Sequence, residues 1–185
     1  SVGDYNLDGT NDIWLSNREY KSNKNNRVIG YVGLIDGKLL LNHKNKPSQE
    51  NELKNLIKKE IFGNSIIPNY DTTGEKYPNS GISYSLSRRG GDHDNDGIID
   101  LVILNHYSYG LAGSLHILSG KKILESNSKT TLNEKEFTTL LGPFTGYLGP
   151  GISTSYDFDK DGYNDILVGA DVDHEQGYSS GSIYI

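Results

Sequence analysis

The sequence predicts an all-β fold in which a unit of four antiparallel strands repeats along the chain. Three observations support this. An acidic nonapeptide with the pattern D-x-[D/N]-x-D-G-x-x-D occurs three times, at residues 4–12, 92–100 and 157–165. Each copy leads directly into a short apolar run that ends at turn residues, which is typical of a buried strand. Two other segments, 30–41 and 113–124, align with each other without gaps.

The repeated nonapeptide predicts a calcium site. Oxygen side chains at positions 1, 3 and 5 of a tight loop converge, and the carbonyl at position 7 and the Asp at position 9 complete an all-oxygen cage of the kind Ca²⁺ prefers. The Gly at position 6 permits the positive φ that such a turn needs. Asp, Asn and Gly also dominate ordinary turns, but three copies with the same fixed positions favour calcium over a simple turn. Mg²⁺ fits less well because it retains its waters.

We therefore expect up to three Ca²⁺ ions, one in each loop. The expected ligands are Asp4, Asn6, Asp8, Thr10 and Asp12 in the first loop, Asp92, Asp94, Asp96, Ile98 and Asp100 in the second, and Asp157, Asp159, Asp161, Tyr163 and Asp165 in the third.

The residues after each loop exclude an EF-hand. An EF-hand carries Glu at position 12 and continues as a helix. Here position 12 is apolar, being Leu15, Ile103 or Val168. The runs at 12–16, 100–104 and 165–170 are aliphatic and partly β-branched, so we expect each loop to lead into a strand.

Residues 149–170, followed by 181–185, resemble an FG-GAP repeat, the repeat of the integrin α-subunit β-propeller and its bacterial relatives. Gly149 lies near the FG position of that repeat, and Gly169-Ala170 matches the GA of its GAP. The first two copies have other residues there, Ser16-Asn17 and Leu104-Asn105, so their resemblance depends mainly on the Asp loops. The resemblance implies a β-propeller in which each calcium loop joins the first and second strands of a blade.

The other aligned segments complete the four-stranded unit. Residues 30–41 and 113–124 each have the pattern of a strand, a two-residue turn and a strand, with the turns at Asp36-Gly37 and Ser119-Gly120. Residues 81–85 likewise match 151–155, ahead of the second and third loops. Four antiparallel strands in each unit are typical of a propeller blade.

We expect three blades, at 1–79 (second to fourth strands, with a helical insertion), 80–149, and 150–185 (first three strands). The motif starts are 88 and 65 residues apart, so the first repeat carries the insertion. Apolar residues recur at helical spacing between Ser48, a candidate N-cap, and Gly63. This predicts an amphipathic helix at about 48–62 packed on its own blade. Because propellers close with about 4–8 blades, we expect the chain to be part of a larger ring and to pair with further blades of the same protein or another copy.

A second irregularity precedes the second loop. Aligning Ser85 with Ser155 leaves residues 86–91 in front of that loop, five more than the third repeat has. Arg88 and Arg89 in this stretch could pair with an anionic ligand, or could belong to a bulge or extended loop.

Composition and charge agree with a calcium-bound extracellular protein. The formal net charge is −6, but 11 of the 24 acidic residues are loop aspartates, so three Ca²⁺ ions would bring the total to zero. The remaining 13 acidic and 18 basic residues are scattered, which does not suggest a nucleic-acid partner. There is no cysteine for a disulfide and no apolar run of the roughly 18 residues that span a membrane. Calcium sites of modest affinity are filled outside the cytosol, so we expect a secreted, cell-surface or periplasmic protein.

The integrin-like resemblance implies a non-catalytic module for adhesion or for binding a protein or glycan ligand, within a larger extracellular or surface protein. Two alternatives are a carbohydrate-binding propeller that uses Trp14 and the tyrosines, and an accessory propeller of a secreted enzyme. There is no G-x-S-x-G, no Cys and no H-E-x-x-H, so we expect no catalytic residue in this chain. Asp171, Asp173, His174 and Glu175 could form a further cation site or an acid/base pair, but a solvated loop is the expected role.

Overall fold

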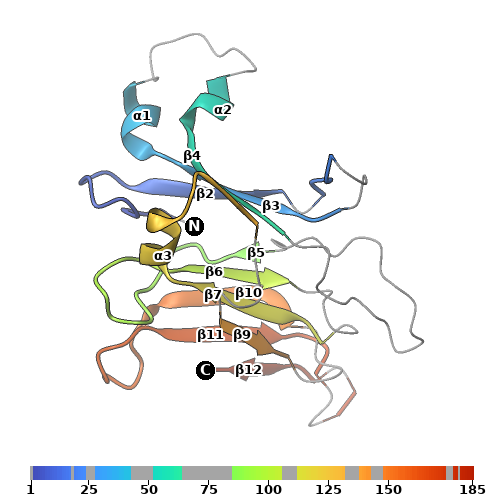
Figure 1. Cartoon of the computed structure of the whole chain (residues 1–185). Helices are drawn as coiled ribbons and strands as arrows, with labels where there is room; N and C mark the ends of the chain where they lie inside the picture. The colour runs from blue at the N-terminus through green and yellow to red at the C-terminus, as the bar shows by residue number, and fades with distance from the viewer. Residues whose placement is uncertain are drawn as a thin grey trace.

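The computed structural model describes residues 2–17, 19–23, 28–42, 52–63, 85–105, 112–131, 138–142, 148–173, 177–178 and 180–185. Its strands form three small sheets that stack on one another, with a few short helices at their margins (Figure 1). The predicted all-β fold is therefore confirmed. None of the helices within these ranges is long and apolar enough to cross a membrane.

The first sheet has the strand order β1-β2-β3-β4-β8. Its members are β1 (Val2–Gly3), β2 (Asp12–Asn17), β3 (Tyr31–Ile35), β4 (Ile57–Phe62) and β8 (Lys129–Thr131). The first four pair antiparallel, and β8 then joins β4 in parallel, with Ile61 opposite Thr130. A strand that follows the second repeat's helix therefore covers the outer edge of the first sheet, which the sequence did not predict.

The second and third sheets are antiparallel. The second contains β5 (Ser85–Leu86), β6 (Leu101–Asn105), β7 (Ser114–Leu118) and β9 (Thr138–Leu141), and the third contains β10 (Leu148–Tyr156), β11 (Asp165–Ala170) and β12 (Ser182–Tyr184). In all three sheets the nonapeptide joins the first strand to the second, as the resemblance implied. The first sheet differs from expectation, because β1 occupies the first-strand position that residues 1–79 were expected to lack. The three loops lie along one side of the stack, on the left in Figure 1.

Strand register corrects the expected alignment before the second loop. Leu86 pairs with Ile103 and Ile152 pairs with Val168, and both partners stand at position 12 of their repeats. Leu86 is therefore equivalent to Ile152. It lies six residues before Asp92, whereas Ile152 lies five before Asp157, so the second repeat has one extra residue rather than five.

The predicted two-residue hairpin turns are wrong. The third strand of each complete sheet is followed by a short helix, α1 (Gly37–Asn42) after β3 and α3 (Gly120–Glu125) after β7. Asp36 caps α1, because its Oδ1 accepts the N–H of Leu39 at 2.9 Å. The two segments are structurally equivalent, as the alignment indicated, but their second halves are helices, and the fourth strands β4 and β9 come later.

The predicted helix at about 48–62 is also largely wrong. Only α2 (Glu52–Leu56) is helical, and Ile57–Phe62 forms strand β4; residues 48–51, including the expected cap Ser48, lie outside the described residues. The buried strand β3 needs a hydrogen-bonding partner on this edge, and Ile61 packs at 3% exposure into the core beneath it. Tertiary pairing therefore overrides the helical spacing of the apolar residues.

The middle sheet is covered on both faces. Leu101 and Ile103 of β6 pack into a core with Trp14 and Val32 of the first sheet. Their neighbours Val102 and Leu104 point the other way and pack with residues of the third sheet, including Val168 and Ala170. Double coverage explains why β6 is a continuous apolar run rather than an alternating one.

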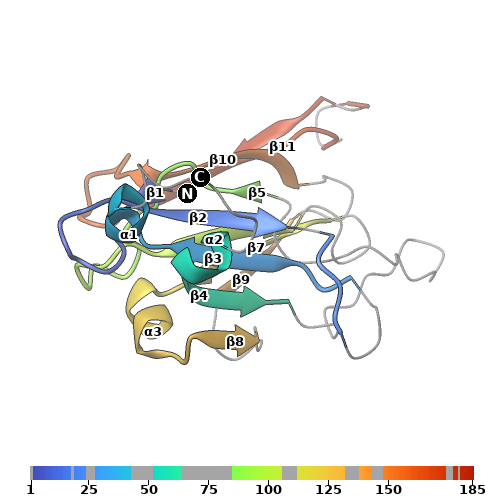
Figure 2. The same ribbon diagram turned by 90° about the horizontal axis from the view of Figure 1, so that it is seen from above.

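The α3–β8 segment forms a strap from the second repeat onto the first sheet (Figure 2). Besides the β4–β8 pairing, the Lys59 ammonium donates hydrogen bonds to the carbonyls of Leu124 (2.8 Å) and Ser126 (2.5 Å) at the end of α3. Partial burial lowers the pKa of Lys59. Sheets one and two are therefore joined by hydrogen bonds as well as by their shared core.

Candidate metal-binding loops

The three acidic loops share one backbone conformation. Position 4 is left-handed in each, with φ of 58° at Leu7, 55° at Asn95 and 64° at Lys160. Position 6 is also left-handed, with φ of 86° at Gly9, 85° at Gly97 and 97° at Gly162. A Cβ at these glycines would meet no atom within 4 Å, so the backbone angle, not lack of space, requires glycine.

Side-chain oxygens hold each loop in this conformation. The Asp4 carboxylate accepts the N–H of Asp8 at 3.0 Å and the N–H of Gly9 at 2.9 Å. The same pair of bonds forms at position 1 of the other loops, to Asp92 and to Asp157. In every loop the oxygen at position 3 also accepts the N–H of position 5, and the position 5 carboxylate accepts the N–H of position 7. These hydrogen bonds therefore hold the acidic side chains against the backbone of their own loop.

The position 9 carboxylate ties the loop to the rest of its sheet. Asp12 is fully buried; it accepts the N–H of Tyr5 at 3.0 Å and the N–H of Gly37 at 2.9 Å. Asp100 makes the equivalent bonds in the second loop, with the N–H groups of His93 and Gly120. Each carboxylate therefore links the start of its loop to the helix that follows the third strand.

Glycine is required where those helices approach the loops. A Cβ at Gly37 would lie 1.9 Å from the carbonyl oxygen of Asn11, and one at Gly120 would lie 2.1 Å from that of Ile99. Backbone atoms cannot yield at such distances. The sequence pattern predicts turns at both glycines and does not predict their contact with the loops. The signal for this contact is that both glycines occupy the same position in the aligned segments 30–41 and 113–124.

The electrostatics of the second loop favour a cation. Burial, together with the nearby carboxylates of Asp100 and Asp96, raises the pKa of Asp94. Burial also acts to raise the pKa of Asp100, but the His93 side chain and backbone N–H donors outweigh it, so the pKa of Asp100 is lowered. In the first loop Tyr5 replaces His93, and burial raises the pKa of Asp12. Carboxylates this close repel one another, and a bound cation would relieve that repulsion.

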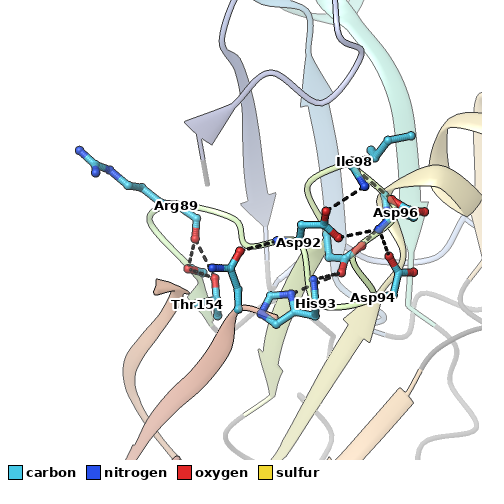
Figure 3. Close-up of polar contacts among 12 residues, drawn as sticks. Arg89, Asp92, His93, Asp94, Asp96, Ile98 and Thr154 are labelled. Atoms are coloured by element: carbon cyan, nitrogen blue, oxygen red, sulfur yellow. Dashed lines mark hydrogen bonds and ion pairs between the residues drawn. The ribbon is translucent and has the colours of Figure 1, made fainter. Parts of the chain in front are cut away.

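Carboxylate oxygens converge in two of the loops. In the second loop one oxygen each from Asp92, Asp94 and Asp100 lie within 4.8 Å of one another. Figure 3 shows the side chains of Asp92 and Asp94 in this loop. In the third loop the corresponding oxygens of Asp157, Asp159 and Asp165 do the same. These groups can hold a metal ion, and an all-oxygen donor set suits a hard cation such as Ca²⁺.

The remaining predicted ligands have a less direct structural basis. In the first loop Asn6 supplies the position 3 oxygen, which accepts the N–H of Asp8 as the position 3 aspartates do elsewhere. All fifteen expected ligands remain predictions. The position 5 carboxylates Asp8, Asp96 and Asp161 and the position 7 carbonyls of Thr10, Ile98 and Tyr163 are not members of the two converging groups.

Two other titratable residues, His116 and Asp173, form hydrogen bonds within the fold. The His116 imidazole in β7 is buried between the hydroxyls of Ser114 (3.0 Å) and Thr139 (3.1 Å). The buried Asp173 carboxylate accepts a hydrogen bond from the Tyr184 hydroxyl at 2.5 Å, and its backbone carbonyl accepts the N–H of Gly181. These contacts tie Asp173 to Gly181 and to strand β12. Of the other members of the predicted acidic cluster, Asp171 is exposed, and His174 and Glu175 lie outside the described residues.

Arg88 and Arg89 contribute to the fold through their backbone. The carbonyl of Arg88 accepts the N–H of Val2 at 3.0 Å, and the carbonyl of Arg89 accepts the Thr154 hydroxyl at 2.8 Å. Figure 3 shows the Arg89 side chain pointing away from the second loop. This short segment therefore contacts both neighbouring sheets, which supports the extended-loop interpretation.

Comparison with known proteins supports the resemblance for the third sheet. Residues 148–185 match the FG-GAP repeat family. The match covers β10, β11, β12 and the loop 157–165 between the first two of these strands. A search of curated protein sequences found no match.

Proposed function

From the FG-GAP repeat at residues 148–185, we propose that the chain is a calcium-stabilised, non-catalytic propeller module, used for adhesion or for binding a protein or glycan ligand. The observation that carries this proposal is one loop built three times from different sequences, with the same two left-handed positions and the same carboxylate-to-backbone hydrogen bonds. An ordinary turn does not require the same two left-handed positions and the same set of hydrogen bonds in three different sequences.

Calcium would supply a positive centre that binds the loop oxygens and offsets their repulsion. The chain provides the rest. Position 1 orients the loop through the N–H groups of positions 5 and 6. Position 9 connects the cage to the first turn of the following helix. A cation held at positions 1, 3 and 9 would therefore stiffen the contact between a loop and its own sheet.

We place the module outside the cell, within a larger secreted or surface protein. Loops of modest affinity fill where calcium is near millimolar, and three ions would cancel the formal charge of −6. The carbohydrate-binding alternative loses Trp14 as a stacking platform, because that ring is buried between sheets and packs edge-on against Tyr5 at 5.7 Å.

Calcium removal tests the proposal. An ion that binds only the folded state at 100 times its Kd stabilises by about 2.7 kcal/mol. For a chain of this size, 1 kcal/mol shifts the Tm by about 2–4 °C. We therefore expect the Tm in EDTA to be at least about 5 °C below that in millimolar calcium, and magnesium to restore less of it. An identical Tm in both buffers would refute calcium stabilisation.

A matched pair of variants assigns the effect to the loops. Asp94→Ala removes one member of the converging carboxylates, whereas Asp171→Ala removes an exposed acid that follows β11. We expect Asp94→Ala to reduce the calcium-dependent Tm shift and Asp171→Ala to leave it unchanged. Equal shifts in both variants would mean that calcium acts elsewhere.

A further inference from the structure

Asn164 belongs to the third loop but forms hydrogen bonds with the backbone of the second loop. Its side-chain Oδ1 accepts the backbone N–H of Asp92 at 2.9 Å, and its own N–H donates to the carbonyl of Asp92 at 3.3 Å. Both peptide groups of Asp92, the position 1 residue of the second loop, are therefore bound to one residue of the third. In sequence Asn164 stands between Tyr163 and Asp165, two predicted ligands of the third loop.

The residues just before Asp92 are packed closely against the third sheet. The Thr154 hydroxyl, buried at 1% exposure, donates to the carbonyl of Arg89 at 2.8 Å (Figure 3). A Cβ at Gly91 would lie 1.8 Å from the carbonyl oxygen of Thr154 and 2.8 Å from the Cβ of Asn164. The segment that enters the second loop is thus packed directly against the third sheet.

The preceding interface uses the same position differently. Position 8 of the second loop is Ile99, and a Cβ at Gly3, the residue before Asp4, would lie 2.6 Å from the Cδ1 of Ile99. Position 8 of a loop thus contacts the start of the preceding loop, both between the first and second sheets and between the second and third sheets. Ile99 makes this contact with an apolar side chain, whereas Asn164 forms directional hydrogen bonds to a ligand residue.

We propose that Asn164 is a positioning residue for the metal site of the second loop, and that it makes calcium binding in the second and third loops cooperative. This rests on the proposed function that the loops bind calcium. An ion in the third loop fixes the residues on either side of Asn164, which in turn fixes the backbone of Asp92. The second ion then has less conformational entropy to remove, and by linkage the effect is reciprocal.

The two loops can be read separately in one calcium titration of the 185-residue chain by NMR. The Gly97 N–H donates to Asp92 in its own loop (2.8 Å), and the Gly162 N–H donates to Asp157 in its own loop (3.0 Å). Their amide resonances therefore report the two sites. Four proteins are compared: the native chain, Asn164→Leu, Asp159→Ala/Asp161→Ala, and the combination of all three substitutions.

In the native background we expect ablation of the third loop to weaken calcium binding at the second about three- to tenfold, the equivalent of one net hydrogen bond. Asn164→Leu alone should weaken the second site to a similar degree. In the Asn164→Leu background, ablation should have no further effect. The matched control Asn11→Leu changes position 8 of the first loop and should leave the coupling intact.

The outcomes are distinct. Ablation of the third loop could weaken calcium binding at the second loop equally in the native and Asn164→Leu backgrounds, or in neither. Either result would overturn the positioning role while leaving calcium binding in place. A native chain in which neither glycine amide responds to calcium would overturn the proposed function together with this inference. A merely structural role for Asn164 would lower the Tm but would not abolish the effect of one loop on the other.

Discussion

At the scale of single residues, the His116 side chain makes stability depend on pH. The imidazole is 1% exposed, and burial lowers its pKa from 6.5 to about 4. The folded pKa therefore lies below the unfolded pKa, so the unfolded chain binds the proton first as the pH falls. The stability that is present above pH 6.5 is lost progressively between about pH 6.5 and 4.

We expect His116 to lower the free energy of unfolding by roughly 2 kcal/mol between pH 7 and pH 5. His116→Gln lacks the titrating ring and should lose this component of the pH dependence, even if it is less stable at pH 7. Urea unfolding in EDTA at both pH values measures it without a contribution from bound metal. The same pH dependence in both proteins would show that His116 is not the source.

At the scale of elements, local patterns predicted the strands beside the loops but not the helices after the third strands. An aspartate followed by glycine suits a hairpin turn and a helix start equally well. At Asp36-Gly37 the choice depends on Gly37 meeting Asp12, 25 residues away. The six residues of β4 likewise became a strand because β3 needs a partner. The loops were predictable because the residues that define them lie within nine positions.

The approach of α3 to the second loop leads to a prediction about Gly120. Gly120→Ala forces a Cβ against the carbonyl of Ile99 and strains the hydrogen bond to Asp100, so we expect a loss of roughly 1–3 kcal/mol in the free energy of unfolding. Gly151→Ala is the matched control, because a Cβ there would meet nothing within 4 Å. Urea unfolding in calcium compares the two. If both variants lost the same small amount, the close approach would not be structurally important.

At the scale of the whole molecule, residues at the same positions of each repeat lie on the face that packs against the next sheet. Position 2 of the loop is buried in the first sheet (Tyr5, 2% exposed) and nearly buried in the second (His93), but Phe158 in the third is 49% exposed. The third strand repeats this pattern, with Val32 buried and Ile183 72% exposed. Within the described residues, the third sheet therefore carries an interface of the same kind with nothing packed against it. Local sequence could not show this, because the equivalences depend on strand register.

The exposed face of the third sheet predicts self-association when this 185-residue chain is expressed alone. Apolar side chains next to the edge strand β12 form the kind of surface that another sheet covers. We expect sedimentation velocity to show larger species as concentration rises, and Ile183→Lys to suppress them by placing a charge on that face. Tyr178→Lys is the control, since Tyr178 is 93% exposed in the turn before β12. A native chain that stays monomeric throughout, or two variants that associate equally, would mean that this face does not accept a further blade.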